Sequence, residues 1–169
     1  PFAAAENGAA PGKVTPVVTD LSSRRREVTV EAFVAGADTV CFALDGQQTS
    51  APVENGTAKA VFTLENAHLW DGLDDPYLYT LTAALDNGES QSVRFGCRKF
   101  EIDPQKGFLL NGRSYPLRGV SRHQDRKGVG IAITKEMMEE DLALILEMGA
   151  NTIRLAHYQH AQHFYDLCD

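Results

Sequence analysis

Hydrophobic and polar residues alternate with a period of two from about residue 14 to residue 96. The segment 28–34 has valine or alanine at every second position, with the polar residues Thr29 and Glu31 between the first three of them. The same alternation recurs at residues 40–44, 58–64, 77–85 and 93–95. The Asn55-Gly56 pair favours a two-residue hairpin turn. Because successive side chains of a strand point to opposite faces, the pattern predicts six or seven short strands. Strands with one apolar face each predict an all-β, immunoglobulin-like sandwich over residues 14–99.

The pattern changes near residue 100, where turn signals within residues 100–117 predict a small hairpin, followed by a short strand at 117–121. Residues 135–148 predict a helix, with Thr134 as its N-cap and Gly149 as its C-terminal stop. Its expected buried stripe consists of Met138, Leu142, Ile145 and Leu146. A strand at 152–156 and a second helix starting near residue 160 complete a parallel βαβ unit.

Strand, helix, strand and helix in this order predict an α/β segment over residues 100–169, the N-terminal part of a (β/α)₈ TIM barrel. A whole barrel takes roughly 250 residues, so we expect this segment to be truncated. Residues 1–13 are rich in alanine, glycine and proline and are expected to form a linker or tail.

The net charge of −7 argues against nucleic acid as a partner, and no apolar run reaches the ~20 residues that a membrane span needs. The Arg24-Arg25-Arg26 run is interpreted as a solvated edge. The three cysteines give no disulfide framework, and a bridge between Cys41 and Cys97 is left open. The single tryptophan, Trp70, lies in a predicted loop, which does not fit the buried strand tryptophan of antibody domains.

Polar side chains follow both strands of the predicted parallel unit. His123 and Asp125 come after the first strand, while Arg154 lies on the second strand and His157 follows it. Because parallel strands end at the same edge of a sheet, these four residues are expected to border one mouth, suited to hydroxyl-rich or anionic ligands. Ordinary capping and turn bonds are the alternative that position alone leaves open.

The histidines at 157, 160 and 163 do not predict a metal site. Three residues of an α-helix fall about 60° short of a full turn. On one helix, the side chains of His157 and His163 would therefore point about 120° apart.

Three blocks of the second half resemble glycoside hydrolase family 2, and within it bacterial β-galactosidases. They are Phe108-Leu109-Leu110-Asn111-Gly112-Arg113, residues 117–123 (LRGVSRH) and residues 149–158 (GANTIRLAHY). The loop from Leu69-Trp70-Asp71-Gly72 to Tyr79 is similar to the loop of the preceding sandwich in that family. The resemblance implies a hydrolase of carbohydrate metabolism that cleaves β-glycosides with retention, through two glutamates about 5 Å apart.

In the family both glutamates lie on later barrel strands, the first within an Asn-Glu pair, and no such pair ends a barrel strand here. The chain by itself is therefore expected to be inactive. The acidic residues at 136 and 139–141 are interpreted as the solvated face of the helix. Some β-galactosidases hold an active-site Mg²⁺ through residues beyond Asp169, so no metal or other cofactor is expected in this segment.

The resemblance also assigns roles to the four rim residues. His123 and His157 match histidines that contact the sugar in the innermost subsite, and Arg154 matches an arginine beside the nucleophile. Asp125 has weaker support. The resemblance implies a bacterial cytoplasmic or periplasmic protein, with the compartment undecided.

Two alternatives remain at this point. A β-glucuronidase or β-mannosidase would differ mainly in loops outside the chain, and a non-catalytic sandwich would act as a binding or spacer module. The unfinished barrel is expected to bury Leu142, Ile145, Leu146, Ile153 and Leu155 against one another. Any apolar surface that remains is expected to meet a second copy of the chain or the sandwich.

Overall fold

The computed structural model describes residues 10–20 and 24–169, which divide into two compact units. The first unit consists of the described part of residues 1–70 together with residues 77–98. The second consists of residues 71–76 and 99–169. The short segment 71–76 lies between two strands of the first unit in sequence, yet its contacts assign it to the second.

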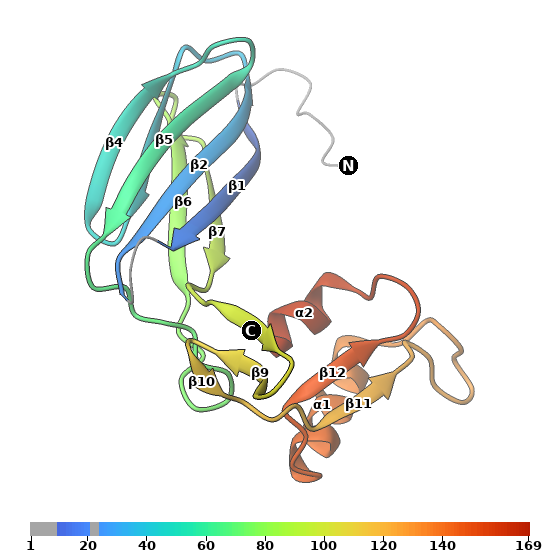
Figure 1. Ribbon diagram of the computed structural model, residues 1–169. Helices are drawn as coiled ribbons and strands as arrows, with labels where there is room; N and C mark the ends of the chain where they lie inside the picture. Colours follow the sequence, from blue (N-terminus) through green and yellow to red (C-terminus); the bar gives the residue numbers. More distant parts are fainter. Residues whose placement is uncertain (1–9, 21–23) are drawn as a thin grey trace. The chain divides into compact units, whose positions relative to one another are not determined.

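The first unit is a β-sandwich of two antiparallel sheets, as the alternating pattern predicts (Figure 1). The three-stranded sheet has the order β1 (Ala10–Asp20), β2 (Arg26–Ala35) and β5 (Thr57–Leu64). The four-stranded sheet has the order β4 (Gln47–Pro52), β3 (Thr39–Leu44), β6 (Tyr79–Leu85) and β7 (Ser90–Phe95).

The core of the sandwich is the apolar face of each strand. On β2 every second side chain is buried, including Val28 and Val30, and the intervening side chains are more exposed. The strands β3, β5 and β6 follow the same rule. The outer face is not purely polar, since Phe33 and Val61 are exposed on the three-stranded sheet. Alternation therefore located the core correctly, and it could not exclude apolar residues from the outer face.

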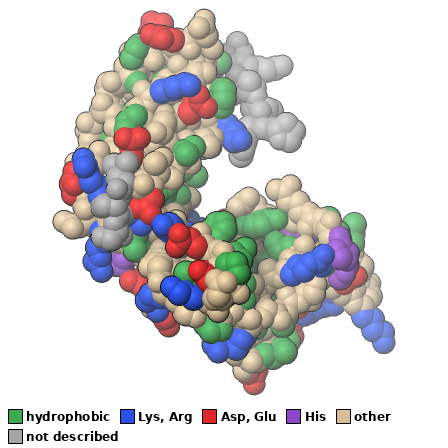
Figure 2. Space-filling model, in the orientation of Figure 1, with side chains coloured by type: hydrophobic (Ala, Val, Ile, Leu, Met, Phe, Trp, Pro, Cys, Tyr) green, Lys and Arg blue, Asp and Glu red, His purple; other side chains and the backbone are tan. Residues whose placement is uncertain are grey.

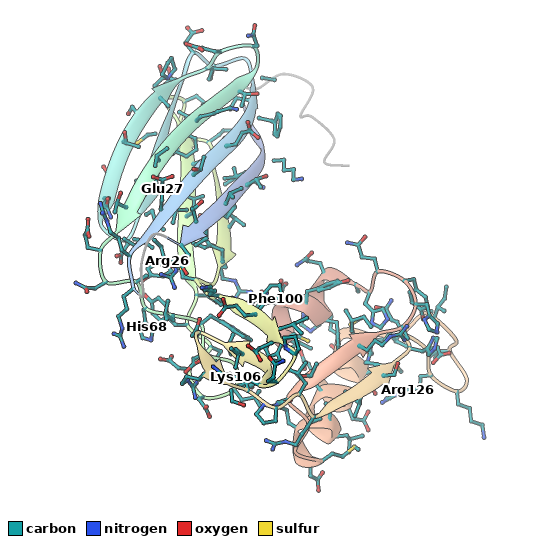
Figure 3. All side chains as sticks on the ribbon, viewed as in Figure 1. Arg26, Glu27, His68, Phe100, Lys106 and Arg126 are labelled. Atoms are coloured by element: carbon teal, nitrogen blue, oxygen red, sulfur yellow. The ribbon has the colours of Figure 1, made fainter. Side chains whose placement is uncertain are left out.

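Arg26 corrects the interpretation of the arginine run as a solvated edge. Arg24 and Arg25 are exposed, but Arg26 is only 2% exposed and forms an ion pair with Asp20 at 2.7 Å. The cause is the period of two, because residue 26 lies on the same face of β2 as Val28. A buried arginine needs a charged partner, and the end of β1 supplies it. Figure 3 labels Arg26 at the start of β2.

The Asn55-Gly56 turn forms, but it does not join the two strands of one hairpin. Both residues have positive φ angles, and Glu54 and Thr57 exchange two backbone hydrogen bonds across the turn. However, β4 before the turn and β5 after it belong to different sheets. Asn55-Gly56 reverses the direction of the chain locally. The packing of the two sheets determines that β5 pairs with β2 and not with β4.

The expected tail also needs correction, because β1 begins at Ala10, inside residues 1–13. Val14 pairs with Ala32, and the register shifts between Pro11 and Val14. Since β1 is an edge strand, it tolerates the proline and glycine that made this segment look like a linker. The rest of the expected tail, residues 1–9, lies outside the described residues.

The three cysteines are free. Cys97 is fully buried in the sandwich core, whereas Cys41 alternates with the buried Val40 and Phe42 and so faces the other way. This opposite facing explains why Cys41 and Cys97 form no bridge. Trp70 lies outside the strands, as predicted, and a Cβ atom at Gly96 would lie 2.8 Å from the Cβ of Trp70. The loop is therefore packed closely on the chain.

The second unit contains a three-stranded antiparallel sheet, a parallel pair of strands and two helices (Figure 1). The antiparallel sheet has the order β10 (Arg113–Ser114), β9 (Gly107–Leu110) and β8 (Phe100–Asp103). The parallel unit runs β11 (Gly119–Arg122), α1 (Lys135–Glu147), β12 (Thr152–Leu155) and α2 (Gln162–Cys168). This is the predicted βαβ order. No helix of the described ranges is long and apolar enough to cross a bilayer.

The ends of α1 match the prediction and its buried stripe does not. Thr134 caps the helix by accepting a hydrogen bond from the backbone of Met137, and Gly149 takes a positive φ angle just after it. Of the expected stripe only Met138 is buried, and Leu146 is 45% exposed. Leu142, Ile145, Ile153 and Leu155 are half-buried. Two strands and one short helix offer too little surface to cover the whole stripe. Figure 2 shows hydrophobic side chains at the surface of this unit.

Candidate functional site

The candidate site lies at the carboxyl ends of β11 and β12. Ser121 pairs with Arg154 and Arg122 with Leu155, and the backbone N–H of Ala156 donates to the carbonyl of Arg122 at 2.9 Å. The ladder thus continues one residue past β12. The loops that follow both strands therefore start at the same edge, as the parallel order requires.

Three of the four predicted residues meet at this edge. Nη2 of Arg154 lies 2.9 Å from Nδ1 of His157, and Nη1 of Arg154 donates to Oγ of Ser121 at 3.4 Å. The rings of His123 and His157 stand edge to face, with centroids 5.5 Å apart. All three side chains are exposed, and Figure 2 shows histidine beside basic side chains at the surface of this unit. Asp125 is exposed as well and takes no part in these contacts.

The Arg154 contact fixes the tautomer of His157. A guanidinium has only donors, so Nδ1 of His157 must accept, and the neutral ring carries its proton on Nε2. Nε2 is therefore a hydrogen-bond donor on an exposed ring. A donor of this kind next to a fixed cation suits a hydroxyl or carboxylate ligand.

A second group of side chains lies behind this edge, where sequence reasoning expected only loop and solvated residues. Arg122, the last residue of β11, is 6% exposed and donates to Oδ2 of Asp141 through Nε at 3.1 Å and Nη2 at 2.7 Å. Its Nη1 lies 3.1 Å from Nδ1 of His160, and its guanidinium lies 4.0 Å from the centroid of the Phe164 ring. Arg122 therefore ties β11, α1 and the α2 segment together.

Asp141 and Glu140 are thus ion-pair partners and not merely a solvated helix face. Arg126, labelled in Figure 3 on the loop after β11, donates to Glu140 at 2.7 Å and to Asp141 at 3.1 Å. The signal that could have revealed this arrangement is the pattern of two acidic neighbours on a helix and two arginines four residues apart before it, one at the end of β11 and one on the loop that follows.

His160 is buried, and burial lowers the pKa of its imidazole, with the nearby positive charge of Arg122 acting in the same direction. The three histidines of the α2 region have three different partners. His157 contacts Arg154, His160 contacts Arg122, and His163 contacts Glu139 at 3.2 Å. Within the described ranges no group of three His, Cys, Asp or Glu side chains is arranged to hold a metal ion.

Family models match both units. The model described as glycosyl hydrolases family 2 matches residues 5–98, and the model of the TIM barrel domain of the same family matches residues 100–169. The chain belongs to glycosyl hydrolase family 2. Its sandwich is thus the immunoglobulin-like domain of this family, and its parallel unit is the start of the family 2 barrel.

Family 2 relatives of more than one specificity resemble the chain. A β-glucuronidase of Bacteroides fragilis is 47% identical over 110 residues, which cover 63% of this chain and 16% of the relative. A β-galactosidase of Bacteroides ovatus is 37% identical over 146 residues, 78% of this chain and 17% of the relative. The solved structure of Bacteroides uniformis β-glucuronidase 3 has a TM-score of 0.83 and 31% identity, over 95% of this chain and 22% of that one. The chain thus spans about a sixth of the length of these two curated relatives.

Proposed function

We propose that the protein carrying this chain is a retaining β-glycosidase, a β-galactosidase of carbohydrate metabolism, whose sugar site includes His123, Arg154 and His157. The observation that carries the proposal is the contact of these three side chains at the carboxyl edge of β11 and β12. In TIM-barrel enzymes this edge is the face that bears the active site. Asp125 is the weakest member of the proposed site, because it does not join these contacts.

Each of the three side chains supplies a defined interaction. The Nε2–H group of His157 can donate to a sugar hydroxyl, and the exposed ring of His123 can donate or accept. Arg154 keeps N–H groups that His157 and Ser121 do not use, and a guanidinium beside a carboxylate holds that group ionised and oriented. These groups bind and orient, while bond cleavage with retention requires a pair of carboxyl groups about 5 Å apart.

Among residues 10–20 and 24–169, the carboxylates do not form such a pair at the site. Asp125 is the acidic residue of the loop that directly follows β11, while Asp141 and Glu140 are held by arginines on α1. The chain contributes binding groups to the proposed site and leaves the acid and the nucleophile to other parts of the protein.

A β-glucuronidase is the second candidate, favoured by the 47% identity to the Bacteroides fragilis β-glucuronidase. A glucuronide carries a carboxylate, and Arg154 is an exposed cation at the proposed site. The two candidates separate when the protein is assayed with 4-nitrophenyl β-galactoside and 4-nitrophenyl β-glucuronide. A higher kcat/KM for the glucuronide would replace the first candidate by the second.

A sugar-binding role for Trp70 in a non-catalytic sandwich is disfavoured by the surroundings of its ring. Sugar-binding modules offer a free aromatic face, but the guanidinium of Arg98 lies 4.8 Å from the centre of the Trp70 ring. The backbone of Gly96 lies against the Cβ and ring of the same residue. Trp70 is a packing residue of the sandwich.

Substitutions in the protein that carries the chain test the proposed site. Arg154→Ala and His157→Ala are expected to lower kcat/KM by about a hundredfold or more, because interactions that strengthen in the transition state are lost. His163→Ala is the matched control, since His163 contacts Glu139 on α1 and should change kcat/KM by less than about threefold. His160 is unsuited as a control because it is buried against Arg122. Equal losses in all three variants would show that these residues do not form the sugar site.

A further inference from the structure

Gln124 connects the two loops that carry the rim histidines. Its backbone N–H donates to the hydroxyl of Tyr158 at 3.0 Å, and its side-chain Oε1 accepts from the backbone N–H of Ala161 at 2.7 Å. Gln124 follows His123 directly, and Tyr158 follows His157 directly. The two bonds therefore join the loops on the residues next to both histidines.

The side-chain bond satisfies one of the backbone donors at the start of α2. Ala161 is the N-cap residue of α2, and its methyl side chain cannot accept a hydrogen bond from the first turn. The carboxamide of Gln124 takes up the free N–H of Ala161 from a loop 37 residues earlier in the chain. A local cap would have fixed the helix alone, whereas this contact fixes the start of the helix to the loop after β11.

The packing around these bonds leaves the histidines little freedom to move separately. The ring of Tyr158 lies 6.0 Å from that of His123 and 5.1 Å from that of His160, measured between centroids. Behind them, Arg122 holds His160 from the end of β11. The 5.5 Å separation of His123 and His157 is thus set by links on either side of both residues.

From this arrangement we infer that Gln124 is a positioning residue, which fixes His123 and His157 at the spacing that the proposed sugar site requires. It acts through Tyr158 and Ala161 and not by contact with the ligand. The inference rests on the proposed function for its ligand, a β-linked sugar, but the link between the loops can be measured without any ligand.

The first test uses NMR of the full chain. Gln124→Met keeps the length of the side chain and removes the acceptor, Gln124→Glu keeps the acceptor, and Gln162→Met is the matched control. Gln162 lies in the first turn of α2 and donates to Asp166 on the same helix. Gln124→Met is expected to accelerate hydrogen exchange of the Ala161 amide by about tenfold or more and to shift the imidazole ¹⁵N signals of His123 and His157.

Gln124→Glu and Gln162→Met are expected to keep the imidazole signals of the parent chain. Circular dichroism of each variant shows whether the fold is retained. Imidazole signals in Gln124→Met that coincide with those of the parent, despite faster exchange at Ala161, would overturn the inference. If Gln124→Met does not fold, Tyr158→Phe replaces it, since it removes one hydroxyl and the same imidazole shifts are expected.

The second test uses the protein that carries the chain, with a 4-nitrophenyl β-glycoside as probe. Gln124→Met is expected to lower kcat/KM by about tenfold with unchanged thermal stability. Gln124→Glu is expected to keep kcat/KM within about threefold of the parent value. A Gln124→Met variant with the activity of the parent would also overturn the inference. A protein that hydrolyses no β-glycoside would refute the proposed function instead, and the imidazole signals would still decide whether Gln124 positions the histidines.

Discussion

Replacing Arg122 by methionine should destabilise the parallel unit far more than the same change at Arg113. Both arginines form an ion pair with an aspartate in the second unit, Arg122 with Asp141 and Arg113 with Asp71. They differ in burial, since the side chain of Arg122 is 6% exposed and that of Arg113 is 53% exposed. The comparison therefore contrasts a buried arginine–aspartate pair with an exposed one.

The expected loss in the free energy of unfolding depends on the environment of the aspartate that each substitution leaves without its arginine. Removing one partner of a buried ion pair costs about 3–5 kcal/mol, because the other charge loses its compensation. Asp141 keeps Arg126 as a partner at 3.1 Å and is itself partly exposed, so we expect the lower limit, about 3 kcal/mol, for Arg122→Met. The loss includes the contact of the guanidinium with the ring of Phe164. The exposed Arg113 pair is screened by solvent and should contribute at most about 1 kcal/mol.

Native-state hydrogen exchange is the suitable assay, because the two units can unfold separately and a single melting curve would mix them. The Ala156 amide donates to Arg122 and the Asn151 amide to Arg118, so both amides report opening of the β11–β12 pair. Arg122→Met should accelerate their exchange about a hundredfold, and Arg113→Met by at most about fivefold. Equal acceleration in the two variants would refute the argument that burial of Arg122 holds the unit together.

Three further outcomes are expected. The 169-residue chain alone should not hydrolyse aryl β-glycosides above the buffer rate, and turnover that persists through repeated purification would contradict the absence of a carboxylate pair at its site. Burial lowers the pKa of His160 below the ordinary value of 6.5, so the unfolded chain binds a proton that the folded chain does not. The free energy of unfolding should therefore be intact above about pH 6.5 and fall as the pH drops below it, and urea titrations should show a weaker fall in His160→Gln. Burial raises the pKa of the Cys97 thiol to about 11, so Cys97 should resist thiol reagents at pH 8 until the chain is unfolded.

The sequence alone determined the sandwich and its core, because a period of two leaves no choice of face. Val28 and Val30 had to lie inward together, and the same rule explains the buried Arg26, which its charge had suggested was solvated. The caps of α1 were equally local, since Thr134 and Gly149 act on their own neighbours. The order of strands and helices further fixed which edge carries His123 and His157. Such signals can be read along the chain, because they depend on the spacing and order of residues and not on contacts between distant segments.

Only the tertiary structure decided the contacts between segments that are distant in sequence. Asn55-Gly56 makes a correct local turn, yet packing of two sheets sends β4 and β5 to different partners. The position of Gln124 gives no sign that it accepts from Ala161, since an acceptor for a free helix N–H can come from any loop that reaches it. Arg122 likewise becomes a buried centre only when β11, α1 and α2 meet around its side chain. A polar side chain forms hydrogen bonds with the groups that the fold places within about 3 Å of it. The periodicity of the sequence does not specify which distant groups these are.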